Sequence, residues 1–296
     1  TETNTGGVEF DKWVSGESES SSAITESPAP EPPLSSAGGN GKGEEASGSQ
    51  EVKATEQEDE VSTIPVNSDD LLQQGLTFLR QGRKESQSRE SLSNAEASFR
   101  QALQCFRAAS QIDPSSAAAH GNQGNTLLAY SRLKMKLMDT LSATSDPRSW
   151  QGGDSESILD ELSKETSGLL IEAGRCFREV LALNSKDAKA LLNWGNALCL
   201  RARMTVGQDV DSAHNLYDAA IEKFEAVLQL EPGMAEVLKA LGMALYDISG
   251  LEGGRERIET LKSAQAYLED ACSISPDDQA LLYTLNQCQA DLGRRV

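Results

Sequence analysis

From about Ser68 onward, apolar residues recur three and four positions apart, which is the spacing of an amphipathic helix. The clearest segments of this kind are 95–112, 213–230 and 235–248. Proline, which ends a helix, directly follows three helical segments, at Pro114, Pro232 and Pro276. The pattern predicts an all-α protein built from helices that end at regular intervals.

One spacing of small, apolar and turn residues occurs four times. A small residue is followed four positions later by a large apolar one, three later by another small or β-branched one, five later by a turn residue, and ten later usually by glycine. Small residues let two helix backbones approach, and the large apolar residue fills the wedge between them. The copies are Ala102-Phe106-Ala109-Pro114-Gly124, Ala173-Phe177-Val180-Ser185-Gly195, Ala220-Phe224-Val227-Pro232-Gly242 and Ala264-Leu268-Ala271-Pro276-Asn286.

The block Ala-x3-Phe-x2-Ala-x4-Pro, followed by Leu or Trp-Gly-x2-Leu, resembles the tetratricopeptide repeat. Trp194 to Leu198 and Leu241 to Leu245 are similar to the first-helix signature of that family, and Gly75 with Phe78 resembles an opening first helix. The resemblance covers residues 68–292. It implies a solenoid of about four helical hairpins, with 278–292 as a capping helix and with ligands held on the concave face of the first helices.

The spacing inside each hairpin departs from the family. The second-helix alanine follows the first-helix glycine by twelve residues in the family, but by 27, 49, 25 and 22 residues here. We expect these extra residues, the longest run at about 130–170, to line one edge of the solenoid, where binding loops gather. Within that run, 127–137 and 158–171 are predicted to lengthen helices and 142–155 to form a loop that carries Trp150.

Residues 1–66 form a separate acidic segment ahead of the predicted solenoid of 67–296. They hold 14 Asp and Glu against 3 Lys and Arg, a net charge of −11, and almost no large apolar side chains. Such a composition predicts a disordered tail. Phe10 and Trp13 stand out in it, either as an incidental feature or as a short motif that docks on a partner or on this protein's own groove.

The first-helix register gives a set of candidate groove residues. An amide side chain both donates to and accepts from the backbone of an extended peptide, although it can equally satisfy a neighbouring helix end or water. Some family members grip a chaperone's carboxylate tail with Lys, Asn and Arg. Here Glu236 and Ala240 stand where the last basic pair belongs, so that partner is disfavoured. The candidate partner-binding residues are Asn125, Asn193, Asn196, Lys189, Lys239 and Tyr246.

Charge and chemistry narrow the function. A net charge of −19 repels nucleic-acid backbones and anionic membranes. No sequence run is apolar enough to span a membrane, and neither a metal-ligand spacing nor a cofactor motif is present. The five cysteines include no C-x-x-C pair, which fits free buried thiols better than disulfides.

These observations lead us to expect a non-enzymatic scaffold or adaptor, with assembly of other proteins as one such role, that binds proteins without cofactor or metal. The alternatives are a catalytic or cofactor-binding role in the inserted segments and a permanent subunit of a large complex. The first residue is Thr1, which fits a removed targeting peptide, a trimmed chain or a fragment. The style of the sequence resembles processed plastid proteins, with the cytosol as the other location.

Overall fold

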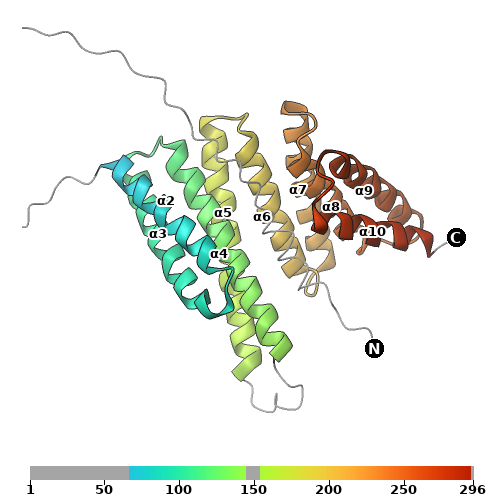
Figure 1. The fold of residues 1–296 in the computed structure, drawn as a ribbon, viewed down its shortest axis with the longest axis horizontal. Coiled ribbons are helices and arrows are strands. Elements are labelled where there is room, and N and C mark those ends of the chain that lie inside the picture. The colour runs from blue at the N-terminus through green and yellow to red at the C-terminus, as the bar shows by residue number, and fades with distance from the viewer. Residues whose placement is uncertain (1–66, 145–153, 295–296) are drawn as a thin grey trace, which may run out of the picture. The chain divides into compact units, whose positions relative to one another are not determined.

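The structure of the protein is a computed structural model that describes residues 67–144 and 154–294. In these two ranges the chain forms nine α-helices and one short 3₁₀ helix, and no strand, so the all-α prediction is confirmed (Figure 1). The elements are α2 (Ser68–Glu85), η1 (Arg89–Ser91), α3 (Leu92–Ile112), α4 (Ala117–Thr144), α5 (Asp154–Leu183), α6 (Ala188–Thr205), α7 (Val210–Leu230), α8 (Ala235–Ser249), α9 (Gly254–Ile274) and α10 (Gln279–Gly293).

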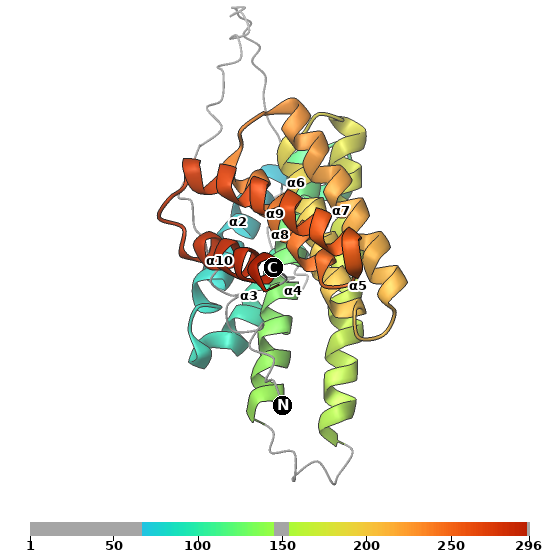
Figure 2. The same cartoon turned by 90° about the vertical axis from the view of Figure 1, so that its right-hand side faces the viewer.

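The helices stack in series as four hairpins and a final single helix. Within the hairpins, α2 packs on α3, α4 on α5, α6 on α7 and α8 on α9. Each second helix then packs on the first helix of the next hairpin, and α9 packs on α10 (Figures 1 and 2). The first helices also contact one another directly, from α2 through α4, α6 and α8 to α10. They therefore form a continuous face, called here the inner face.

Inside every hairpin, one glycine of the first helix lies against one large side chain of the second. A Cβ atom placed on Gly195 would come within 2.4 Å of the Phe224 ring, and the other three pairs would meet at 2.7–2.8 Å. Only the missing side chain allows this approach. The four contacts join Gly75 to Phe106, Gly124 to Phe177, Gly195 to Phe224 and Gly242 to Leu268.

This pairing follows the hairpins expected from the repeat, in which each first-helix glycine precedes the second-helix alanine of the same hairpin. In the sequence pattern each aromatic was grouped with the glycine ten residues after the turn. That glycine belongs to the first helix of the next hairpin, where it contacts the large apolar side chain of that hairpin's second helix. The repeated sequence block, from alanine to glycine, therefore begins in one hairpin and ends in the next. The glycine and the large side chain that pack together belong to the same hairpin.

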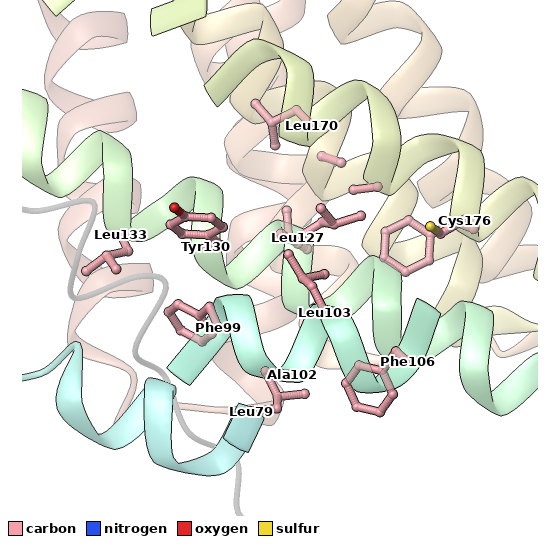
Figure 3. Packing of buried hydrophobic residues seen from close by; sticks show 14 of the residues in the cluster. Leu79, Phe99, Ala102, Leu103, Phe106, Leu127, Tyr130, Leu133, Leu170 and Cys176 are labelled. Carbon is pink, nitrogen blue, oxygen red and sulfur yellow. The ribbon is translucent and has the colours of Figure 1, made fainter. Parts of the chain in front are cut away.

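Buried apolar side chains form a core that continues from hairpin to hairpin. Figure 3 shows Phe106 near Leu79 and Ala102, with Phe99 below Tyr130. The rings of Phe99 and Tyr130 have centroids 6.0 Å apart. The predicted small and wedge positions are fully enclosed, as at Ala102 and Phe106. Burial of this kind contributes roughly 25 cal/mol per Å² of apolar surface removed from water.

Most of the extra residues lengthen helices. The predicted extensions 127–137 and 158–171 lie inside α4 and α5, which reach 28 and 30 residues and project beyond their neighbours (Figure 2). The predicted loop 142–155 is wrong at both ends, because α4 continues to Thr144 and α5 begins at Asp154. Apolar side chains of both helices keep the pair in contact, with Leu133 and Leu170 buried. Residues 145–153, with Trp150, lie outside the described residues.

The other three hairpins close with short connections of residues 86–91, 206–209 and 250–253. The expected edge of inserted binding loops is therefore an edge of short turns in these hairpins. The extra length shifts the turns outward and adds helical surface, which in the fourth hairpin lies on α9 (21 residues) and not on α8 (15 residues). Any added binding capacity of the described insertions must come from helix faces.

The last helix agrees with the predicted cap. The Asp278 side chain accepts a hydrogen bond of 3.0 Å from the Leu281 amide and so begins α10, which packs against α9 and α8. Asn286, which replaces the expected glycine, is exposed. No second helix follows α10 in the described chain, so no aromatic side chain requires a glycine there. The tail 1–66, with its predicted disorder, lies outside the described residues.

The glycine contacts predict a pair of opposite mutational effects. Gly195→Ala should lower the free energy of unfolding by about 1–3 kcal/mol, because the enclosed Phe224 ring has no space to retreat. Gly168→Ala in α5 is the matched control, since nothing lies within 4 Å of its Cβ position. It should be neutral or stabilise by up to about 1 kcal/mol through helix propensity. Urea unfolding followed by circular dichroism measures both, and equal effects would contradict the packing described.

Candidate partner-binding surface

Two of the predicted groove amides bond to each other. The Asn193 side chain of α6 donates through Nδ2 to Oδ1 of Asn125 on α4, at 2.9 Å. Both are half-buried on the inner face and link two consecutive first helices. The structure thus brings this predicted pair together. The alternative, that such amides hydrogen-bond to neighbouring groups of the chain, holds for Nδ2 of Asn193 and Oδ1 of Asn125. The remaining Nδ2 of Asn125 and Oδ1 of Asn193 are the atoms left for a ligand.

Asn196 differs from that pair. It stands one turn after Asn193 on α6 and is half-buried. Its Oδ1 atom is enclosed and has no hydrogen-bond partner. A buried acceptor without a donor costs about 1–3 kcal/mol.

The two predicted lysines have different surroundings. Lys189 is exposed at the start of α6. Lys239 on α8 has a side chain only 12 % exposed, and its Nζ lies 2.5 Å from Oδ2 of Asp278. Burial raises the pKa of Asp278, but the hydrogen bonds from Lys239 and from the Leu281 amide outweigh burial and hold the pKa below its usual value. Lys239 therefore fastens the capping helix.

Tyr246 also belongs to the C-terminal packing. It lies half-buried beside the buried cluster that α8, α9 and α10 share. Burial, together with the nearby Asp291 carboxylate, raises the pKa of its hydroxyl to about 12. The structure therefore places Tyr246 and Lys239 with the cap, apart from the amides of α4 and α6. Phe10 and Trp13 lie outside the described residues.

Sequence reasoning missed three arginines in a shared register. Each stands eight residues after the packing glycine of its hairpin, at Arg83, Arg132 and Arg203. We call these three residues the arginine row. The sequence contained the signal, because Gly75, Gly124 and Gly195 were already recognised, but their side-chain environments were not visible from spacing alone.

The chemistry of the described residues offers no reactive cluster. No group of three His, Cys, Asp or Glu side chains in residues 67–144 and 154–294 could hold a metal ion. All five thiols are free, and burial raises the pKa of Cys176 and Cys199 to about 12 and that of Cys288 to about 11. Such thiols are poor nucleophiles. Within the same described ranges, no helix combines the length and apolar character that crossing a membrane requires.

The hairpins stack in series, and each carries its glycine, wedge and turn residues at matching positions. This arrangement identifies the fold. The described chain has a tetratricopeptide-like fold. A family model described as regulator of microtubule dynamics protein 1-3 matches residues 157–287 of this array, which is less than half of the chain. No curated protein sequence matches the chain significantly.

Three solved structures are similar to this tetratricopeptide-like array at low sequence identity. YrrB, described as a TPR protein with an unusual peptide-binding site, is 20 % identical; the match covers 71 % of this chain and 97 % of YrrB, with a TM-score of 0.29. MamA is 18 % identical, with 64 % and 98 % covered and a TM-score of 0.27. The designed helical repeat protein DHR64 is 16 % identical, with 75 % and 96 % covered and a TM-score of 0.34.

The Lys239–Asp278 pair predicts a pH-dependent contribution to stability. Lys239→Met should lower the free energy of unfolding by about 0.5–1.5 kcal/mol at pH 7. Because the folded pKa of Asp278 is depressed, this contribution is present above the usual carboxyl pKa and is lost as the pH falls through the folded pKa. The difference between wild type and variant should therefore shrink on acidification. Denaturant unfolding at pH 7 and pH 3 checks it, with the exposed Lys189→Met as control; a difference independent of pH would contradict it.

Proposed function

We propose that this protein is a protein–protein interaction scaffold that holds segments of partner proteins on its inner face. The observation that carries the proposal is the enclosed, unpaired Oδ1 of Asn196 on a face formed by consecutive first helices. Beside it, one amide donor of Asn125 and one amide acceptor of Asn193 remain after their mutual hydrogen bond. Together these groups complement the alternating N–H and C=O groups of an extended peptide.

The role we propose is that of an adaptor or assembly factor without catalytic activity. It acts in the plastid or in the cytosol, and those are the two compartments in which its partners should be sought. Phe10 and Trp13, in the acidic segment, are proposed as a second attachment motif for partners. The exposed Lys189, at the start of α6, is proposed as a contact at the margin of the inner face.

Proximity labelling with the full chain in its native cell tests the proposal. Asn196→Ala should remove partners that wild type labels, because a peptide N–H loses its acceptor; a loss of roughly three- to tenfold in affinity is expected for one neutral hydrogen bond. Asn286→Ala is the matched control, since that amide is exposed on α10. An unchanged set of partners for Asn196→Ala would refute the assignment of the inner face.

A second arm uses microtubules, because the family model that matches 157–287 is described by its role in microtubule dynamics. Binding in a co-sedimentation assay should show the same dependence on Asn196. Size-exclusion chromatography of the expressed chain separates an adaptor from a permanent subunit. We expect a monodisperse species, whereas aggregation of the lone chain would favour the permanent subunit.

A further inference from the structure

The arginine row lies on helical surface that the extra residues create. In the family that the sequence resembles, only twelve residues separate the first-helix glycine from the second-helix alanine. A position eight residues beyond the glycine then falls at or past the turn. Here α2, α4 and α6 continue past that position and carry Arg83, Arg132 and Arg203 on it. The fourth hairpin has Gly250 there, directly after α8, so the row ends.

Arg132 lies on the inner face together with the amides already described. It follows Asn125 on α4 by seven residues, two helical turns, which returns it to the same side of the helix. Arg203 follows Asn196 on α6 by the same interval. Arg83 and Arg203 both lie close enough to Arg132 to act on its charge, which places the three guanidinium groups across neighbouring first helices.

Arg203, the member of the arginine row on α6, is paired with a carboxylate of the same chain. Arg203 donates through Nε and Nη2 to Oδ2 of Asp247 on α8, at 2.8 and 2.7 Å. Arg132 has no such carboxylate. Its Nε atom is enclosed without a hydrogen-bond partner, and none of the charged groups that act on it is acidic. Burial, followed by repulsion from Arg83 and Arg203, lowers the pKa of Arg132 to about 10.

Lys134, two residues from Arg132 on the opposite side of α4, shows how this chain treats a buried cation elsewhere. Its side chain is 3 % exposed, and its Nζ lies 2.8 Å from Oε2 of Glu165 and 3.5 Å from Oε1 of Glu96. It also lies 4.9 Å from the centroid of the Tyr130 ring. A cation that serves packing is therefore given partners by the neighbouring helices, and Arg132 is not.

Arg132 is half-buried, and a guanidinium with an enclosed, unpaired Nε and no counter-ion costs stability. Arg132 remains protonated at neutral pH, so that cost is carried by the protein in the absence of a ligand. An anion placed at Arg132 would regain the lost interaction and would also relieve the repulsion within the row.

Asn196 supplies the complementary half of the site. The Asn125–Asn193 hydrogen bond marks one level along the two helices. At a rise of about 1.5 Å per residue, Asn196 lies about 4.5 Å beyond that level and Arg132 about 10 Å beyond it, both toward the hairpin turns. The two residues stand on adjacent first helices. An extended peptide of a few residues spans such a separation at about 3.3 Å per residue.

We propose that Arg132 binds a side-chain carboxylate of an acidic partner segment, which lies across α4 and α6 and donates a backbone N–H to Asn196. This inference rests on the proposed function and names the chemical class of the partner segment. A peptide is favoured because it carries both an anionic oxygen for Arg132 and an N–H donor for Asn196. Nucleic acids and anionic membrane surfaces are disfavoured, since residues 67–296 still carry a net charge of −8, the whole chain's −19 less the tail's −11.

Fluorescence anisotropy of a fluorescein-labelled hexaglutamate peptide with the full chain tests the proposal. Arg132→Gln should weaken binding about tenfold or more, because a charge-assisted hydrogen bond is lost. Arg178→Gln is the matched control, since it removes the same charge from an exposed position on α5. Equal affinities of wild type and both variants for hexaglutamate would overturn the proposal.

Thermal unfolding of the same proteins gives a second readout that does not depend on the dye. Without peptide, Arg132→Gln should melt above wild type, because an uncompensated buried charge has been removed. Hexaglutamate should raise the melting temperature of wild type and of Arg178→Gln but not that of Arg132→Gln. A lower melting temperature of Arg132→Gln in the absence of peptide would show a structural role and would also overturn the proposal.

Two further probes fix the ligand class. Hexalysine should not bind through Arg132, and inorganic phosphate at millimolar concentration should compete weakly. Tight binding of phosphate that depends on Arg132 would assign the site to a phosphate ligand and overturn the acidic peptide. Loss of labelled partners in Asn196→Ala, with hexaglutamate binding insensitive to Arg132, would leave the scaffold function standing and refute only the carboxylate site.

Discussion

The contact between a glycine of each first helix and a large side chain of each second helix determines how close the two backbones come. At Gly195 the Phe224 ring occupies the space of a side chain, and the same arrangement recurs in the other hairpins. Because the approach is repeated, successive hairpins stack with similar geometry, and the first helices meet one another along a single face. The inner face, with its amides and its arginine row, exists because this contact fixes the spacing.

Two kinds of polar residue lie on and around that face. Some are consumed by the structure, as Lys239 is by Asp278 and Arg203 is by Asp247. Others have one enclosed atom without a partner, as Arg132 has at Nε and Asn196 at Oδ1. Proteins commonly retain such unfavourable groups where a ligand completes them, at some cost in stability. The contrast within one chain, between Lys134 with its carboxylates and Arg132 without one, is the strongest physical reason to regard the inner face as a binding surface.

Much of the fold could be predicted from the sequence, because the packing residues repeat in a readable register. The alanines, the wedge residues and the closing helix were placed correctly, since helix pairs admit few residue types where their backbones touch. The sequence did not show how far the extra residues would extend the helices. Apolar residues at helical spacing, such as those of 127–137, indicate that a helix continues, but their spacing does not say where it ends. Nor could it reveal that Asn193 bonds Asn125 or that Lys239 meets Asp278, because those pairs depend on side chains brought together from different hairpins. The arginine row was visible as a register, yet its meaning required knowing which arginine has a carboxylate.

A double-mutant cycle between Gly195→Ala and Phe224→Val measures the central contact directly. If the ring is what excludes a side chain at position 195, the alanine should destabilise wild type but cost little once the ring has been replaced, with a coupling free energy of about 1 kcal/mol or more. Strictly additive effects of the two substitutions on the free energy of unfolding would show that the glycine and the ring do not touch, and the described stacking of the hairpins would fail with that result.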